Sequence, residues 1–137
     1  MYPEEICTPM RLDLTDAGFQ EMKTSDEVTA VLDQKEGSVL VMINSVCGCA
    51  AGNARPAVKM AAQHSKIPTK LTTVFAGQDK EAVAKVRDYC LPYPPSSPSI
   101  ALFKDGELVH FIERHHIEGR PADLIAQNLI QAFEEYC

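Results

Sequence analysis

The chain has 137 residues and a net charge of −6 at pH 7, with 45% hydrophobic and 23% charged side chains. This composition excludes a disordered or membrane-spanning chain, because it matches the average of folded soluble domains. The acidic balance repels phosphate groups and anionic lipids, so we expect neither a nucleic acid nor a membrane partner. The length fits one domain over residues 1–137, since domains most often have about 100–150 residues.

The sequence also indicates where the protein is located and which roles its cysteines have. The longest apolar run is Val39–Ile43, far short of the ~20 residues of a spanning helix, and the acidic start Met1–Glu5 does not resemble a secretory signal. We therefore expect a cytoplasmic protein, whose thiols stay reduced. Five cysteines are too few and odd in number for a disulfide scaffold, which leaves chemistry or packing as their roles: Cys7, Cys47, Cys49, Cys90 and Cys137.

The first half of the chain predicts a helix followed by a βαβ unit. In chain order, the predicted elements are a helix over 25–36, a strand over 39–43, a helix over 50–64 and a strand over 71–75. Thr24 and Glu27 have the spacing of a capping box, and Gly37 ends the helical pattern. The unbroken apolar run of the first strand is typical of a central strand covered on both faces. Pro56 predicts a kink in the second helix.

The second half predicts a helix, a hairpin and a last helix. The predicted elements are a helix over 79–89, a proline-rich loop over 91–99, strands over 100–103 and 108–112, and a helix that begins at Pro121 and runs to the end of the chain. Asp105-Gly106 between the two strands is a strong hairpin signal. The buried stripe of the last helix is predicted to comprise Leu124, Ile125, Leu129, Ala132, Phe133 and Tyr136.

These elements predict an α/β fold with a central mixed sheet flanked by helices. A βαβ half followed by a ββα half is the order of the thioredoxin-like fold, which we take as the fold class. The segment before residue 24, which contains Cys7, has no assigned shape.

Cys47-Gly48-Cys49 stands where the central strand is expected to end and a helix to begin. Free N–H groups and the partial positive charge of a helix start favour a thiolate over a thiol, so Cys47 is predicted to be the nucleophile. Cys49 is close enough to attack a mixed disulfide formed on Cys47 and is therefore predicted to be the resolving thiol. Gly48 gives the backbone the freedom to close this small ring.

The proline loop supplies a second candidate feature. In thioredoxin-like proteins a cis-proline at this point faces the nucleophile and lets the backbone before it pair with substrate. Ser97-Pro98 is the candidate cis bond, and Ser97, Pro98 and Gly48 are the candidate substrate-binding residues.

With both features in view, the chain closely resembles the bacilliredoxin family of thioredoxin-like bacterial proteins. The resemblance is carried by Cys47-Gly48-Cys49 within Asn44–Gly52 and by the segments Ala54–Ala57, Val74–Ala82, Pro95–Ser99, Val109–Ile112 and Ile117–Gly119. It implies reduction of mixed disulfides between cytosolic proteins and bacillithiol, a small thiol that some bacteria use in place of glutathione. It also implies some disulfide isomerase activity.

The family resemblance gives the site residues specific roles. It implies that Cys47 takes bacillithiol onto itself and that Cys49 is its redox neighbour. Cys137, at the C-terminus, also matches the family pattern, which leaves it either an incidental thiol or an auxiliary redox thiol. Bacillithiol would then be a co-substrate, with no bound cofactor and no metal. The partners would be bacillithiolated cytosolic proteins and a low-molecular-weight thiol.

Three other interpretations of the cysteines stay open. Cys47 and Cys49 would be plain buried hydrophobes if the fold sealed them from solvent. They would belong to a thiol-binding or metal-carrying protein without turnover if Cys7, Cys90, His64 or His115-His116 completed a ligand set. Cys90 is interpreted as a packing residue, and Cys7 as a packing or a surface thiol.

Overall fold

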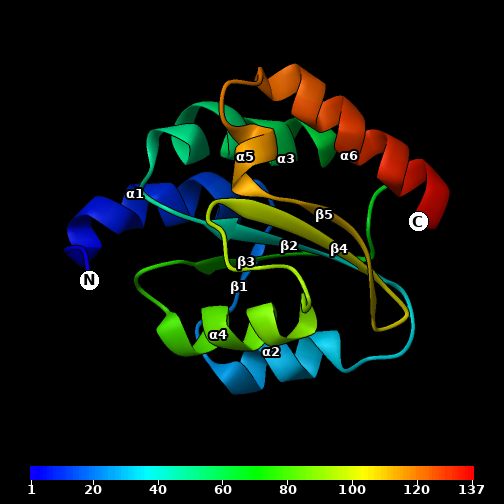
Figure 1. The fold of residues 1–137 in the computed structure, drawn as a ribbon, viewed down its shortest axis with the longest axis horizontal. Coiled ribbons are helices and arrows are strands. Elements are labelled where there is room, and N and C mark those ends of the chain that lie inside the picture. The colour runs from blue at the N-terminus through cyan, green and yellow to red at the C-terminus, as the bar shows by residue number, and fades with distance from the viewer.

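A five-stranded mixed sheet with helices on both faces forms the protein (Figure 1). The computed structural model describes every residue from Met1 to Cys137. The strands are β1 (Gln20–Glu21), β2 (Ser38–Asn44), β3 (Lys70–Phe75), β4 (Ser99–Lys104) and β5 (Glu107–Ile112). The helices are α1 (Glu4–Thr15), α2 (Ser25–Leu32), the π-helix η1 (Ala50–Ala54), α3 (Arg55–Ala61), α4 (Lys80–Tyr89), α5 (Arg114–Ile117) and α6 (Ala122–Tyr136).

The strand β2 is the centre of the sheet, whose order is β1-β3-β2-β4-β5. It pairs in parallel with β3 and antiparallel with β4, so that Val41 lies between Thr72 and Ala101. All seven residues of β2 are buried, which confirms the prediction drawn from the apolar run. The hairpin prediction is also confirmed, because β4 and β5 pair antiparallel and both Asp105 and Gly106 have positive φ.

The two faces of the sheet hold separate hydrophobic cores. Side chains alternate along a strand, so Leu40 and Met42 face α3 and α6, whereas Val39, Val41 and Ile43 face α2 and α4. Figure 1 shows these two helical layers above and below the sheet. The mixed sheet and its two helical layers confirm the thioredoxin-like fold class and fix the carboxyl end of β2 between them.

Two predicted helices are shorter than their patterns suggested. The helix predicted over 25–36 ends at Leu32. Thr24 caps it as predicted, since its Oγ1 accepts the Glu27 N–H at 3.1 Å, but the Glu27 carboxylate accepts from the N–H of Lys23 rather than of Thr24. The helix predicted over 50–64 is the π-helix η1 followed by α3, which ends at Ala61. Pro56 lies just after the change of helix type, as the second residue of α3, and it has no N–H to donate to the preceding turn.

The sequence did not predict α1, β1 or α5, and it misplaced one residue of α6. Leu124 was expected in the buried stripe of α6, but 54% of it is exposed. It lies on the face of the helix that meets His110 and Phe111 at the surface. The rest of the predicted stripe is buried, apart from Tyr136, which is half-buried.

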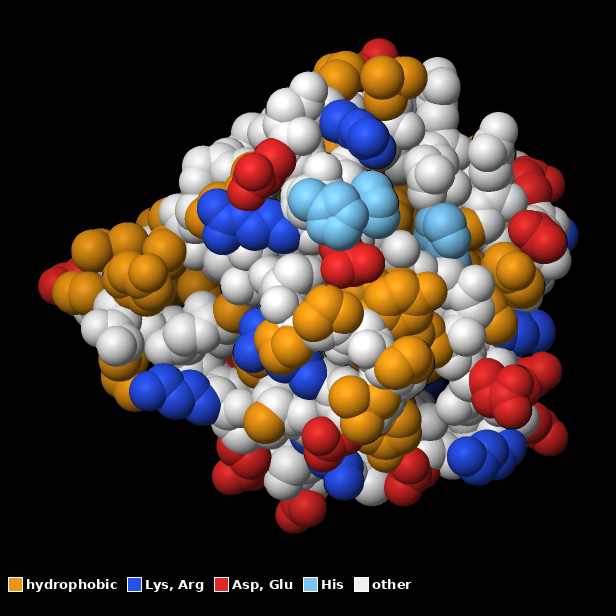
Figure 2. Space-filling model, in the orientation of Figure 1, with side chains coloured by type: hydrophobic (Ala, Val, Ile, Leu, Met, Phe, Trp, Pro, Cys, Tyr) orange, Lys and Arg blue, Asp and Glu red, His pale blue; other side chains and the backbone are white.

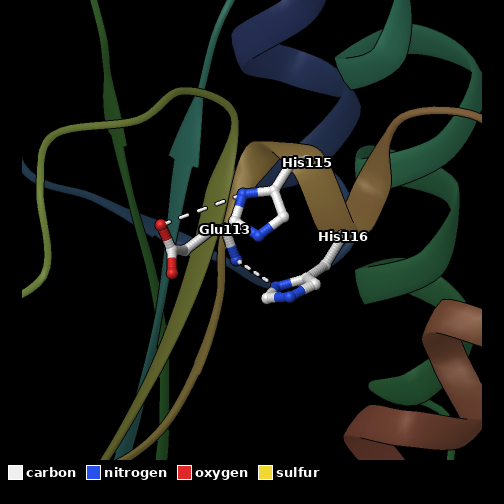
Figure 3. A group of neighbouring side chains, drawn as sticks. All are labelled: Glu113, His115 and His116. Carbon is white, nitrogen blue, oxygen red and sulfur yellow. Dashed lines mark hydrogen bonds and ion pairs between the residues drawn. The ribbon is translucent and has the colours of Figure 1, made fainter.

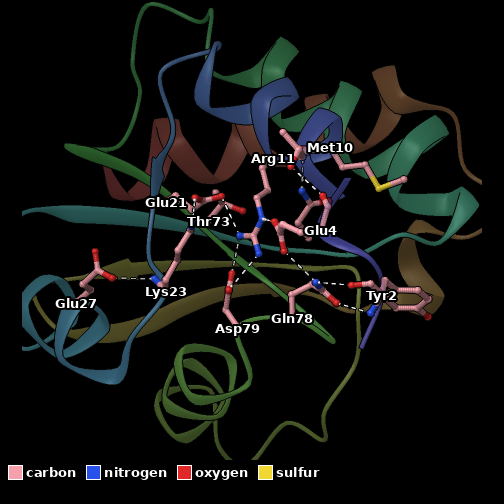
Figure 4. Close-up of polar contacts among 12 residues, drawn as sticks. Tyr2, Glu4, Met10, Arg11, Glu21, Lys23, Glu27, Thr73, Gln78 and Asp79 are labelled. Atoms are coloured by element: carbon pink, nitrogen blue, oxygen red, sulfur yellow. Dashed lines mark hydrogen bonds and ion pairs between the residues drawn. The ribbon is translucent and has the colours of Figure 1, made fainter. Parts of the chain in front are cut away.

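Helix α1 is attached to the sheet through Arg11, only 7% of which is exposed (Figure 4). Its guanidinium donates to Glu4 at 2.6 Å, to Glu21 at 3.0 Å and to Asp79 at 2.7 and 3.1 Å, and it stacks over the Phe75 ring. Three carboxylates therefore satisfy one buried cation, which connects α1 to β1 and to the start of α4. Burial alone would lower the pKa of Arg11, but these carboxylates raise it above its ordinary value.

No helix combines the length and the apolar character that crossing a bilayer requires. Figure 2 shows acidic and basic side chains interspersed on the face in view, with a group of histidines near its middle and hydrophobic side chains beside them. This face therefore carries no continuous basic patch.

Candidate functional site

Cys47 lies in the short connection between β2 and the helical segment that leads into η1. Its carbonyl accepts hydrogen bonds from the N–H groups of Ala50 at 3.0 Å and Ala51 at 3.2 Å, so it occupies the start of the first helical turn. Cys47 and Cys49 are both half-buried, and both are free thiols. The interpretation of the pair as sealed hydrophobic residues is therefore wrong.

The two thiols have opposite acidities. Burial alone would raise the pKa of Cys47, but hydrogen bonds from the Cys49 thiol and from the N–H groups of Cys49 and Ala50, together with the positive charge of Arg114, lower it below its ordinary value. Burial raises the pKa of Cys49, as do the hydrogen bond it gives to Cys47 and the negative charge there. The predicted direction for the pKa of Cys47 is confirmed, and Cys47 is the more acidic of the two thiols.

A buried polar network holds the connection that carries Cys47. The guanidinium of Arg55, 5% of which is exposed, donates to Asn44 Oδ1 at 2.8 Å and to the Ser45 carbonyl at 3.0 Å, and it lies 3.3 Å from Asp13. Ser45 Oγ in turn accepts the N–H of Cys47 at 3.3 Å. The backbone before the thiol is thus fixed by side chains from α1, β2 and α3.

The Ser97–Pro98 peptide bond is cis, as predicted, and Pro98 is buried. Arg114, the first residue of α5, donates from Nη1 to the Ser97 carbonyl at 3.1 Å and pairs through Nε with Glu118. That carbonyl, expected to face a substrate backbone, therefore already has a partner in this structure.

A surface hollow of about 260 Å³ joins these parts, and we call it the Cys47 hollow. It is lined by residues that include Cys47, Ser97, Arg87 and Arg114. Of the predicted site residues it brings together Cys47 and Ser97, but Gly48 is exposed and does not line it. A Cβ at Gly48 would meet no atom within 4 Å, and its φ is not positive, so nothing in this reduced form requires glycine there.

The other three cysteines lie apart from the site. Cys7 and Cys90 are buried, and burial raises the pKa of both, that of Cys90 to about 11. Their interpretation as packing residues agrees with this. Cys137 follows α6, whose 15 residues span about 22 Å from the end of the helix nearer α5. The structure does not bring Cys137 into the Cys47 hollow, and its auxiliary role stays a prediction.

The ligand set proposed for a metal carrier does not form around the cysteines. One group of side chains lies close enough to hold a metal ion, and it comprises Glu113, His115 and His116 without any cysteine (Figure 3). His116 Nδ1 already accepts the Glu113 N–H at 3.4 Å, and His64 pairs with Glu134 elsewhere. The metal-carrier interpretation therefore lacks further ligands for Cys47 and Cys49.

Sequence reasoning missed three arginines that shape the site. Arg55, Arg87 and Arg114 lie 8, 40 and 67 residues after Cys47 in the sequence, and only the fold brings them to it. The one local signal was the pair of polar residues Asn44-Ser45 at the end of an otherwise apolar strand, since buried polar groups need partners.

Solved structures share this fold. The thioredoxin of Malassezia sympodialis aligns with a TM-score of 0.61 and 14% identity, covering 87% of this chain and 90% of that one. A thioredoxin of Schistosoma mansoni aligns with a TM-score of 0.57 and 18% identity, covering 85% and 96%. These likenesses place the protein in the thioredoxin-fold class, with the Cys47-Gly48-Cys49 pair after the central strand.

Sequence relatives define the family within that class. Residues 2–137 match the family described as Disulphide isomerase. A bacilliredoxin of Cytophaga hutchinsonii is 59% identical over 135 residues, covering 98% of this chain and 99% of that protein. A bacilliredoxin of Salinibacter ruber is 55% identical over 140 residues, covering 99% and 81%. The chain belongs to the bacilliredoxin family.

Proposed function

We propose that this protein reduces mixed disulfides between bacillithiol and cytosolic proteins and so removes bacillithiol from those proteins. The observation that carries the proposal is the pairing of Cys47, whose pKa is lowered, with a neighbouring Cys49, whose pKa is raised and whose thiol donates a hydrogen bond to Cys47. A thiolate attacks disulfides, and a neighbouring thiol resolves the product. The printed names of the relatives support bacillithiol as the small thiol.

The reaction has two exchange steps, neither of which needs a bound cofactor or a metal. The Cys47 thiolate attacks the bacillithiol sulfur, the mixed disulfide breaks, and the substrate cysteine leaves as a thiolate that takes a proton from water. Cys49 then loses its proton and attacks Cys47, which releases bacillithiol and leaves a Cys47–Cys49 disulfide. Alternatively, the thiolate of a second bacillithiol attacks the adduct, which forms bacillithiol disulfide and releases Cys47 as a thiolate, so that the enzyme stays reduced.

The test compares three proteins with one bacillithiolated substrate. Wild type is expected to restore the substrate thiol, Cys47→Ser to lose this activity at least ~1,000-fold, since the nucleophile is gone, and Cys49→Ser to hold the adduct on Cys47. Intact-protein mass spectrometry detects a retained bacillithiol directly, and Cys90→Ser is the matched control. Equal transfer by wild type and Cys47→Ser would overturn the proposal.

Disulfide isomerisation is a second candidate function. The description of the matching family supports it, and so does the half-exposed Cys47. An isomerase must attack a wrong protein disulfide and then be released by a substrate thiol. Refolding of a scrambled disulfide protein in the presence of wild type and Cys47→Ser tests this function, and no acceleration by wild type would exclude it.

A further inference from the structure

The Cys47 hollow is cationic, although the chain as a whole is acidic. Two arginines line it, Arg87 from α4 and Arg114 from α5, and no aspartate or glutamate does. The chain carries 19 acidic residues against 13 basic ones. The lining of this hollow has the opposite charge balance, with two basic side chains and no acidic one. This charge lies next to the predicted nucleophile.

The Arg87 guanidinium has no partner in the protein. It makes no ion pair and no hydrogen bond, and its Nε is buried from solvent. Arg114 uses Nε for Glu118 and Nη1 for the Ser97 carbonyl. A buried donor without an acceptor costs free energy, whereas the guanidinium of Arg11 has three carboxylates. Arg87 thus has the donors of a binding residue and none of the contacts of a structural one.

We infer that the Cys47 hollow binds the carboxylates of the small-thiol half of the mixed disulfide, with Arg87 as their main partner and Arg114 as a second. This inference rests on the proposed function and adds the groups that recognise the small thiol. Guanidinium groups bind carboxylates through paired, charge-assisted hydrogen bonds. Bacillithiol fits this chemistry because its malyl group carries carboxylates. The volume of about 260 Å³ suits such a group better than a folded protein surface.

The hollow keeps its shape through contacts outside the thiol pair. Tyr2 lines it, and its backbone exchanges hydrogen bonds with the Gln78 side chain at 2.6 and 2.9 Å (Figure 4). Gly77, which also lines it, has a φ of +89°, and a Cβ there would lie 3.3 Å from the Tyr2 ring. The turn after β3 therefore holds the start of the chain against the hollow.

Binding in this hollow also decides which sulfur is attacked. With its carboxylates on Arg87, the small thiol places its own sulfur next to Cys47, while the substrate cysteine points away. The new bond then forms between Cys47 and the small thiol, the old disulfide breaks, and the substrate cysteine leaves with the electron pair and is protonated by water. One disulfide replaces another, so no oxidant or reductant is consumed.

The experiment measures the rate at which Cys47 takes up an adduct in the Cys49→Ser protein. The probes are bacillithiol disulfide, which is anionic, and bis(2-hydroxyethyl) disulfide, which is neutral. A substitution that changes the nucleophile strength of Cys47 affects both rate constants, so this effect cancels in their ratio. Arg87→Gln is expected to lower this ratio about tenfold, and Arg87→Lys, which keeps the charge, to restore part of it. Arg120→Gln is the matched control, since Arg120 lines a different hollow beside His110 and Leu124, and it should leave the ratio unchanged.

The possible outcomes separate this inference from the proposed function. If Arg87→Gln leaves the ratio unchanged while both probes form adducts, the carboxylate site is wrong and the proposed function stands. If neither probe forms an adduct on Cys47, both are wrong. Salt supplies a test on the Cys49→Ser protein without further substitution: added salt should slow the anionic probe and not the neutral one, and equal responses would also overturn the carboxylate site.

Discussion

Cys47 and Cys90 lie at helix ends of opposite polarity, and the comparison shows what makes a thiol reactive in this fold. Cys47 precedes a first helical turn, with N–H groups directed at its sulfur and Arg114 nearby. Cys90 is the C-cap of α4, 2% exposed, and burial raises its pKa to about 11. Carbonyls rather than N–H groups point outward at such an end. The same residue type is thus activated at one position and inert at the other.

The backbone support of the two sites differs as well. The connection before Cys47 depends on buried polar groups joined by Arg55, whereas Cys90 packs among apolar side chains of the α2–α4 layer. Arg55→Met would leave the Ser45 carbonyl without its donor and Asn44 Oδ1 with the Ser45 N–H alone, and we expect it to lower the free energy of unfolding by about 3 kcal/mol. Denaturant unfolding followed by circular dichroism measures this. Arg55→Lys should lower the free energy of unfolding by less. A decrease below ~0.5 kcal/mol for Arg55→Met would show that the polar network does not stabilise the fold.

Cys49→Ala should make Cys47 more like an ordinary thiol. It removes the thiol that donates a hydrogen bond to the Cys47 sulfur, which is one cause of its lowered pKa. The pKa of Cys47 then rises, the thiolate fraction at pH 7 falls, and alkylation at that pH slows several-fold. The rate of iodoacetamide labelling of Cys47 at pH 7 measures this effect. A faster reaction would mean that Cys49 suppresses the thiolate instead of stabilising it.

Cys90→Ala should alter stability without altering reactivity. The sulfur fills space in the layer between α4 and the sheet, and its loss is expected to cost about 1 kcal/mol and to lower the melting temperature by a few degrees. Labelling of Cys47 should be unchanged, because Cys90 does not line the Cys47 hollow. A change in that labelling rate would show that the two regions are coupled.

The smallest effect is expected for Arg114→Gln. The positive charge of Arg114 contributes to the lowered pKa of Cys47, but its side chain is 46% exposed, so water and salt screen it. The substitution should raise the pKa of Cys47 and slow labelling at pH 7 about twofold at low ionic strength, with a smaller change in high salt. The pH profile of labelling at two salt concentrations checks this, and a salt-independent effect would indicate a lost contact instead of a lost charge.

The sequence predicted the parts of this fold that local patterns determine. The apolar run of β2 and the Asp105-Gly106 turn depend on neighbouring residues, as does the start of α6, which was predicted at Pro121 and lies at Ala122. Helix α1 was missed because its anchor, Arg11, depends on Glu21 and Asp79, which are distant in the sequence. Leu124 was misplaced because helical spacing does not show where the edge of a buried stripe lies.

The site also has features that short motifs predict and features that depend on the fold. Cys47, Cys49 and the cis bond before Pro98 follow from short motifs, and the structure gives the two thiols different acidities and confirms the cis bond. The charges that act on Cys47 could not be predicted, because Arg114 reaches it only after the chain has built the hairpin and returned to the carboxyl end of β2. Pairing between distant side chains requires the fold.

The most direct measurement of the central claim is the pH dependence of alkylation at Cys47 and Cys90 in one wild-type sample, resolved by peptide mass spectrometry. A lowered pKa predicts that labelling of Cys47 reaches half its maximum below the value of about 8.5 for a free thiol. Cys90, with a pKa of about 11 and almost no exposure, should stay unlabelled over that range. A midpoint for Cys47 at or above that of a free thiol, or equal labelling of both residues, would contradict the account.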